Sequence, residues 1–212
     1  MEKNDLKKAL EELKKNPQRK FVQSYDLIIN LKAVDLKQTP IDFAVTLPFT
    51  NGKKIKVGAF VAQELEEQAK KFCDVVIKDT TFDQFKDKKV AKKLAEEYDF
   101  FIAQANIMAK VAAAVGRFLG PKGKMPNPKM GCVVPPNANL EPLIKKLRTT
   151  VKLSAKKGIN LQCLIGKENQ PDEEIIENVM TVYNATLKQM PNETQNIKNV
   201  TLKLTMSKPV KV

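Results

Sequence analysis

The sequence contains no histidine and no tryptophan, and only 3 of its 212 residues are cysteine. Without histidine, the chain cannot form a Ser-His-Asp or Cys-His triad, use histidine as a general base, or build most kinds of zinc site. Cys73, Cys132 and Cys163 lie far apart and are odd in number, so neither a disulfide framework nor a Cys-x-x-Cys metal site is expected. The sequence therefore predicts a protein without metal or cofactor that is not an enzyme.

No hydrophobic run approaches the ~20 residues that a membrane-spanning helix needs. The first residues also lack the apolar core of a signal peptide. We therefore expect a cytoplasmic protein that does not associate with membranes. Ten phenylalanines and three tyrosines are too few for an extended platform on which RNA bases would stack.

Positive charge is abundant, because 37 lysines and arginines face 24 aspartates and glutamates, for a formal net charge of +13. A chain this basic either tolerates repulsion between its own charges or binds a polyanion. RNA and DNA are the usual polyanions, since each bound phosphate releases a counterion. A generally basic proteome, or simple solubility, would also explain the charge. The 42% of hydrophobic residues favours a globular chain over a disordered one.

The two ends of the chain share one hydrophobic pattern. Residues 41–47 and 200–204 alternate between apolar and polar, which is typical of a strand that is buried on one face. Residues 6–13 and 172–190 repeat apolar residues at helical spacing. These ends predict an α+β domain, an antiparallel sheet covered by helices on one face.

The middle of the chain has a different pattern, in which short apolar strands alternate with helices. The expected strands are 55–61, 74–77 and 100–103, and the expected helices are 63–71, 86–97, 105–118 and 139–149. Alternation of this kind predicts a parallel βαβ sheet, a Rossmann-like α/β domain. We therefore expect a split domain at 1–57 and 155–212 and an inserted domain at 58–154, with a hinge where the chain crosses between them.

The most distinctive segment is a Gly- and Pro-rich basic loop at 116–131. From Lys110 to Met130 there are five basic residues and no acidic one, and we expect contact with phosphates from the following four: Arg117, Lys122, Lys124 and Lys129. The alternative is a solvated basic loop. The loop is not a nucleotide-binding P-loop, because Phe118 stands where the first glycine is required and Met125 replaces the hydroxyl that would hold magnesium.

Two shorter groups at the chain ends mix cations, hydroxyls and apolar side chains. Residues 19–24 precede an expected strand, and residues 205–209 follow another. Such a mixture can hydrogen-bond to 2′-hydroxyls and phosphates while packing on ribose. Ordinary loop chemistry would account for either group alone.

Several of these segments resemble one known family. The residues from Gly116 to Lys129, read as GRFLGPKGKMPNPK, look like the signature of the ribosomal protein L-one family. Residues 20–24 (KFVQS) and 136–139 (PNAN) resemble its archaeal members. Thr205-Met206 resembles the family's C-terminal Thr-Met-Gly. The resemblance covers nearly the whole chain, and its motifs occur in the family's order.

The resemblance implies a fold of two α/β domains, one inserted in the other, and a role as a monomer within the large ribosomal subunit. There the family binds 23S-type ribosomal RNA in the mobile stalk near the tRNA exit site and assists tRNA release, and many members repress translation of their own messenger RNA. The implied RNA contacts lie in the split domain, at Lys20, Phe21, Ser24, Asn199, Thr205, Met206 and Ser207. The basic loop would face tRNA or more distant RNA.

One residue departs from the family pattern, because Ser207 stands where glycine is usual. Serine adopts positive φ less readily than glycine, although its hydroxyl offers a hydrogen bond of its own. Two functions remain as alternatives: an enzyme that binds a nucleotide on the βαβ domain, and a DNA-binding repressor.

Overall fold

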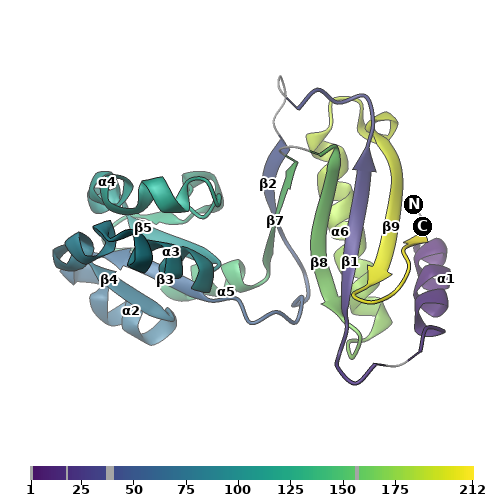
Figure 1. Cartoon of the computed structure of the whole chain (residues 1–212), viewed down its shortest axis with the longest axis horizontal. Helices are drawn as coiled ribbons and strands as arrows, with labels where there is room; N and C mark the ends of the chain where they lie inside the picture. Colours follow the sequence, from purple (N-terminus) through teal and green to yellow (C-terminus); the bar gives the residue numbers. More distant parts are fainter. Residues whose placement is uncertain (1, 18, 37–40, 156–157) are drawn as a thin grey trace. The chain divides into compact units, whose positions relative to one another are not determined.

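The computed structural model describes residues 2–17, 19–36, 41–155 and 158–212 (Figure 1). The chain divides into two compact units, which we call the terminal domain (Met1–Lys53 and Thr149–Val212) and the inserted domain (Lys54–Arg148). One contains an antiparallel sheet and the other a parallel sheet. The predicted combination of α+β and α/β architecture is therefore confirmed.

A four-stranded antiparallel sheet forms the centre of the terminal domain. Its strand order is β10-β9-β1-β8, with bounds β1 (Ser24–Leu31), β8 (Asn160–Lys167), β9 (Ile197–Leu204) and β10 (Val210–Lys211). Two helices, α1 (Lys3–Lys14) and α6 (Asp172–Gln189), pack against one face of this sheet, and Figure 1 shows α6 running behind the strands. The opposite face carries no helix among the described residues.

Strict alternation of buried and half-exposed residues along the strands makes this packing of helices on one face possible. In β1, the side chains of Tyr25, Leu27, Ile29 and Leu31 are buried, whereas the intervening residues are half-exposed. Leucines of α1 and apolar residues of α6 complete the same core. A strand that projects successive side chains to opposite faces thus gives the terminal domain one apolar and one open, mostly polar face.

A separate two-stranded sheet pairs β2 (Ile41–Thr46) with β7 (Thr150–Ala155) in antiparallel fashion along their whole length. The sequence did not predict β7, and it placed residues 150–154 in the inserted domain. Pairing of β7 with β2 places residues 150–155 in the terminal domain, and the compact units divide after Lys53 and Arg148, earlier than the predicted 57 and 154.

The inserted domain has a parallel sheet with helices on both faces. The strand order is β4-β3-β5-β6, with bounds β3 (Val57–Val61), β4 (Val75–Lys78), β5 (Phe100–Gln104) and β6 (Val133–Val134). Residues of α2 (Glu66–Phe72) and α5 (Leu140–Arg148) share one core. Residues of α3 (Lys88–Glu97) and α4 (Met108–Leu119) share the core on the other face. The elements are joined by 3-10 turns at Gln63–Leu65, Asp79–Lys86, Ala105–Ile107 and Pro128–Met130, and a fifth, Glu193–Asn196, lies in the terminal domain.

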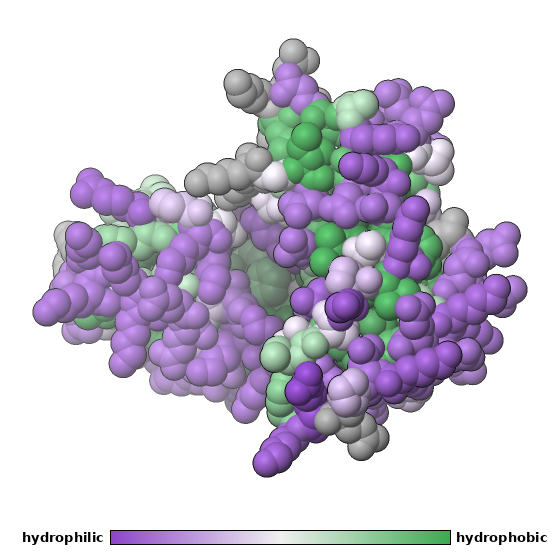
Figure 2. Space-filling view, turned by 45° about the vertical axis from the view of Figure 1, so that its right-hand side comes forward, coloured by the Kyte–Doolittle hydropathy of each residue, from purple (hydrophilic) through white to green (hydrophobic). Residues whose placement is uncertain are grey.

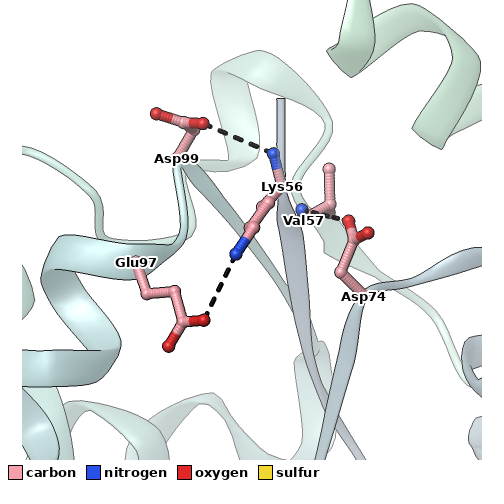
Figure 3. A network of polar contacts seen from close by, with 5 residues as sticks. All are labelled: Lys56, Val57, Asp74, Glu97 and Asp99. Atoms are coloured by element: carbon pink, nitrogen blue, oxygen red, sulfur yellow. Dashed lines mark hydrogen bonds and ion pairs between the residues drawn. The ribbon is translucent and has the colours of Figure 1, made fainter. Parts of the chain in front are cut away.

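Acidic side chains fix the amino end of β3 (Figure 3). The Lys56 amide donates to Asp99 Oδ2 at 3.3 Å, and the Val57 amide donates to Asp74 Oδ2 at 2.8 Å. Lys56 Nζ also pairs with Glu97 Oε1 at 3.2 Å. Since Asp74 and Asp99 directly precede β4 and β5, these bonds satisfy amides at the sheet edge and fix where neighbouring strands begin.

Candidate RNA interface

The two terminal segments meet at one end of the antiparallel sheet. Strands β1 and β9 pair antiparallel, with Tyr25 opposite Leu204, so the residues before β1 lie beside those after β9. Residues 20–24 and 205–207, about 180 positions apart in the chain, therefore form one surface. We call this surface the β1–β9 end.

Thr205 joins the two segments directly. Its Oγ1 accepts a hydrogen bond from the Ser24 amide at 3.1 Å, and it lies 3.5 Å from the Ser24 carbonyl oxygen. The sequence predicted Thr205 as an RNA contact, and the structure shows that its hydroxyl also positions the start of β1. An oxygen that accepts one bond keeps a second lone pair, so Thr205 can still accept from a ligand.

Gln23 is the buried residue that connects the other parts of the β1–β9 end. Its side chain is 3% exposed, and its Oε1 accepts from the Met206 amide at 3.2 Å. Its own amide donates to Glu168 Oε2 at 3.2 Å, and its carbonyl accepts from the Glu168 amide at 2.9 Å. Three chain segments thus meet at Gln23. Gln23 was not among the predicted RNA contacts, although the alternation of buried residues in β1 (Tyr25, Leu27, Ile29), continued backwards, points to it.

Apolar side chains project from the β1–β9 end into solvent. Phe21, Val22 and Met206 are 51%, 52% and 59% exposed, whereas most of the surface visible in Figure 2 is hydrophilic. An open hollow beside them is lined by Arg19, Lys20, Phe21, Val22, Glu168 and Asn169. Exposed apolar groups next to cations mark a surface suited to binding a partner.

Ser207 has a local role in the turn that follows β9. Its Oγ accepts from the Leu204 amide at 2.8 Å and lies 3.0 Å from the Lys208 carbonyl oxygen. Among the described non-glycine residues, positive φ occurs at Ala33 and Glu193, so Ser207 is not strained. The turn therefore does not require glycine here, and the serine hydroxyl closes the turn rather than projecting outward.

Asn199 lies apart from the other predicted contacts. It stands opposite Asn30 near the far end of β9, and Asn30 Nδ2 donates to Asn199 Oδ1 at 2.6 Å. Asn199 thus belongs to the open face of the sheet and not to the β1–β9 end.

Nearer that end, Asp26 lies opposite Lys203. Burial raises the pKa of Asp26, and Lys203 opposes this shift.

The basic loop of the inserted domain uses two of its cations internally. Lys122 Nζ pairs with Glu96 Oε1 at 3.1 Å, and Lys124 Nζ donates to the Tyr98 carbonyl oxygen at 2.6 Å. Both bonds hold the loop to the end of α3. Arg117 and Lys129 are exposed and lie in α4 and a 3-10 turn. The loop is thus partly structural, and its four predicted phosphate contacts are not equivalent.

The carboxyl ends of β3 and β5, where open α/β sheets bind nucleotides, hold groups that do not favour phosphate. Gln104 is fully buried there, and its Oε1 accepts from the Ala62 amide at 2.9 Å. Its Nε2 donates to Glu64 Oε2 at 2.7 Å. Glu66 and Glu67 follow in the first turn of α2. The Gln104 amide and the Glu64 carboxylate thus occupy the region that a nucleotide would require, while Glu66 pairs with Lys70 and Lys78.

Two of the three cysteine thiols are poorly suited to nucleophilic chemistry. Burial raises the pKa of Cys73 to about 11 and that of Cys163 to about 12. Both thiols are therefore protonated at neutral pH, and the thiolate is the reactive form.

No described helix is both long and apolar enough to cross a membrane.

Comparison with known proteins decides the family. The profile of the Ribosomal protein L1p/L10e family matches residues 13–208. The chain belongs to this family. It is 43% identical over 213 residues to the large ribosomal subunit protein uL1 of Nanoarchaeum equitans (strain Kin4-M), covering 99% of this chain and 98% of the relative. It is 38% identical to the same protein of Thermoplasma volcanium, covering 100% and 97%, and to that of Archaeoglobus fulgidus, covering 100% and 99%.

Family membership confirms the resemblance found in the sequence, including its archaeal character. The chain is a protein of the large ribosomal subunit that binds ribosomal RNA. Its place in the cell is accordingly the ribosome in the cytoplasm, as predicted.

Proposed function

We propose that the β1–β9 end of the terminal domain grips folded ribosomal RNA in the mobile stalk of the large subunit. The observation that supports this most is the junction of residues 20–24 with residues 205–207. Thr205 and the buried Gln23 fix that junction through hydrogen bonds to Ser24 and Met206. A surface held in this way is preorganised, so little conformational entropy is lost when RNA binds.

Recognition would depend on the shape of the RNA more than on its base sequence. The exposed Phe21 and Met206 side chains offer apolar area against ribose, and Lys20 offers a cation for phosphate. The free lone pairs of Thr205 and of backbone carbonyls can accept from 2′-hydroxyl groups, which distinguish RNA from DNA. Asn199 would join only when the RNA extends across the open face of the sheet.

The finer roles are those that the family resemblance implies. A protein in the stalk near the tRNA exit site would assist tRNA release through transient contact with tRNA. The same β1–β9 end would bind a similar fold in the protein's own messenger RNA and repress its translation. The protein would act without catalysis, as one copy in each ribosome. Gln104 and the carboxylates near it speak against the nucleotide-binding alternative.

Crosslinking of the full chain to large ribosomal subunits, followed by mapping of the attached nucleotides, tests this proposal. We expect crosslinks from positions 21 and 206 to fall within one folded RNA element. Crosslinks scattered over unrelated RNA would contradict it. Competition with duplex DNA at matched salt separates the remaining alternative, since a DNA-binding repressor would bind the duplex as well as it binds folded RNA.

A further inference from the structure

The order of charges along helix α3 is the reverse of that in the other helices with charged ends. Helices α1, α2, α5 and α6 each have an acidic residue in the first turn and a basic residue in the last turn. This order complements the helix dipole, which is positive at the N-terminus. Helix α3 instead has Lys88 and Lys89 in its first turn and Glu96 and Glu97 in its last, and these four charges oppose the dipole. The acid at its N-terminus is the N-cap Asp87, whose side chain accepts from the Lys89 amide at 3.0 Å.

The glutamates of α3 are explained by their contacts, whereas the lysines are not. Glu96 pairs with Lys122 of the basic loop, and Glu97 pairs with Lys56 at the start of β3. Lys88, Lys89 and two further lysines one turn later are exposed, and none of them forms an ion pair with another described residue. The four lysine side chains therefore form no ion pair that would explain their place in the described part of the inserted domain.

The four lysines lie together on the solvent side of α3. Lys88 and Lys92 are one turn apart, as are Lys89 and Lys93, which gives two short rows of positive charge on adjacent lines of the helix. The buried residues of α3, Ala91, Leu94 and Ala95, face the core. The N-terminal half of the dipole adds positive potential to the same rows.

We propose that the exposed lysine rows of α3 (Lys88, Lys89, Lys92 and Lys93) form a second RNA-binding surface, which binds the phosphate backbone without reading base sequence. This inference rests on the proposed function in one respect, namely that the polyanion bound by the protein is ribosomal RNA. Phosphodiesters satisfy closely spaced ammonium groups that have no partner within the described part of the protein. Val90, 41% exposed, is the one large apolar residue among them, so the surface lacks the apolar centre of a protein–protein interface.

Salt dependence of RNA binding by the full chain tests this second surface. One variant changes all four α3 lysines to glutamine. A matched control changes Lys70, Lys71, Lys145 and Lys146 to glutamine. These control lysines lie in the last turns of α2 and α5, on the opposite face of the same sheet. Both variants lose the same formal charge from the same domain. The control also removes the ion pairs of Lys70 with Glu66 and of Lys145 with Glu141, so the melting temperatures of both variants are measured alongside.

The probe is deproteinised large-subunit ribosomal RNA, titrated at several potassium chloride concentrations. For each phosphate that the variant no longer binds, the slope of log K against log salt should shrink by roughly 0.7–0.9. The α3 variant should therefore show a slope smaller by roughly 1.5–3.5 if two to four lysines bind phosphate, while the control keeps a slope close to that of the unmodified chain. The α3 variant should also melt at the same or a higher temperature, because its change removes charges that oppose the dipole.

An α3 variant that melts normally but keeps the slope of the control would overturn the inference. So would a reduced affinity for another ribosomal protein with unchanged RNA binding. A short fragment that contains only the stalk RNA separates this inference from the proposed function. Variants of the β1–β9 end should weaken binding to the fragment, whereas the α3 variant should bind it as the unmodified chain does.

Discussion

Replacement of Thr205 by valine removes a hydroxyl group while keeping the shape of the side chain. In the free protein, the Ser24 amide would lose the acceptor that lies 3.1 Å away. This bond is exposed to solvent, so water can replace the missing oxygen. The free energy of unfolding should therefore fall by only the net worth of a hydrogen bond, about 0.5–1.5 kcal/mol.

The same substitution should cost more when RNA covers the β1–β9 end. The complex excludes the water that would satisfy the Ser24 amide, and the RNA also loses the free lone pair of Thr205. An unsatisfied buried group costs about 1–3 kcal/mol. At 1.4 kcal/mol for each factor of ten, binding of the stalk RNA should weaken by roughly 5- to 150-fold.

The assay compares dissociation constants for the stalk RNA fragment with thermal unfolding of the free protein. Thr205→Ser, which keeps the hydroxyl and removes only a methyl group, is the matched control and should bind much more tightly than Thr205→Val. A valine variant that binds as tightly as the unmodified chain would refute the proposed role of Thr205. Equally weakened binding in both variants would show that the methyl group, and not the hydroxyl, carries the contact.

Three further predictions concern single side chains. Gln23→Leu should free the Met206 amide and weaken RNA binding more than Val22→Ala does, which a binding titration with both variants would decide. Lys124→Met should lower the melting temperature without changing the salt slope of RNA binding, because the Lys124 ammonium group donates to the Tyr98 carbonyl oxygen. Calorimetry measures the melting temperature, and Lys129→Met, at an exposed position, is the control. Burial raises the pKa of Tyr25 from 10.0 to about 12. The folded state therefore holds this proton more tightly, and stability should fall as pH rises from 10 to 12. Denaturant unfolding of Tyr25→Phe over that range should lack this decline.

The elements that the sequence predicted are those whose pattern is local. The alternation in residues 200–204 and the strand–helix order in the middle of the chain were enough to predict these elements. Burial on one face gives a repeating apolar pattern that is visible within a few residues. Strand β7 was missed, although Val151, Leu153 and Ala155 alternate with polar residues. Its partner β2 lies about 100 positions earlier, and no local signal showed that residues 150–155 leave the inserted domain to pair with it.

The RNA interface was predictable as segments but not as contacts. Motif resemblance located residues 20–24 and 205–207, yet the direction of each polar side chain depends on the register of β1 with β9. That register turns the Thr205 hydroxyl toward Ser24 and places Gln23 beneath Met206. It also sets Asn199 near the far end of its strand, opposite Asn30. Long-range pairing therefore decides which residues face a ligand and which ones hold the surface together.

The separation of these segments along the chain also bears on why the inserted domain exists. The cost of closing a loop rises only with the logarithm of its length, by about 0.6 kcal/mol for each doubling. An insertion at 54–148 therefore adds little to the cost of bringing residues 20–24 and 205–207 together. Retention of the inserted domain is better explained by a binding surface of its own, and the lysine rows of α3, which form no ion pair with another described residue, would provide one.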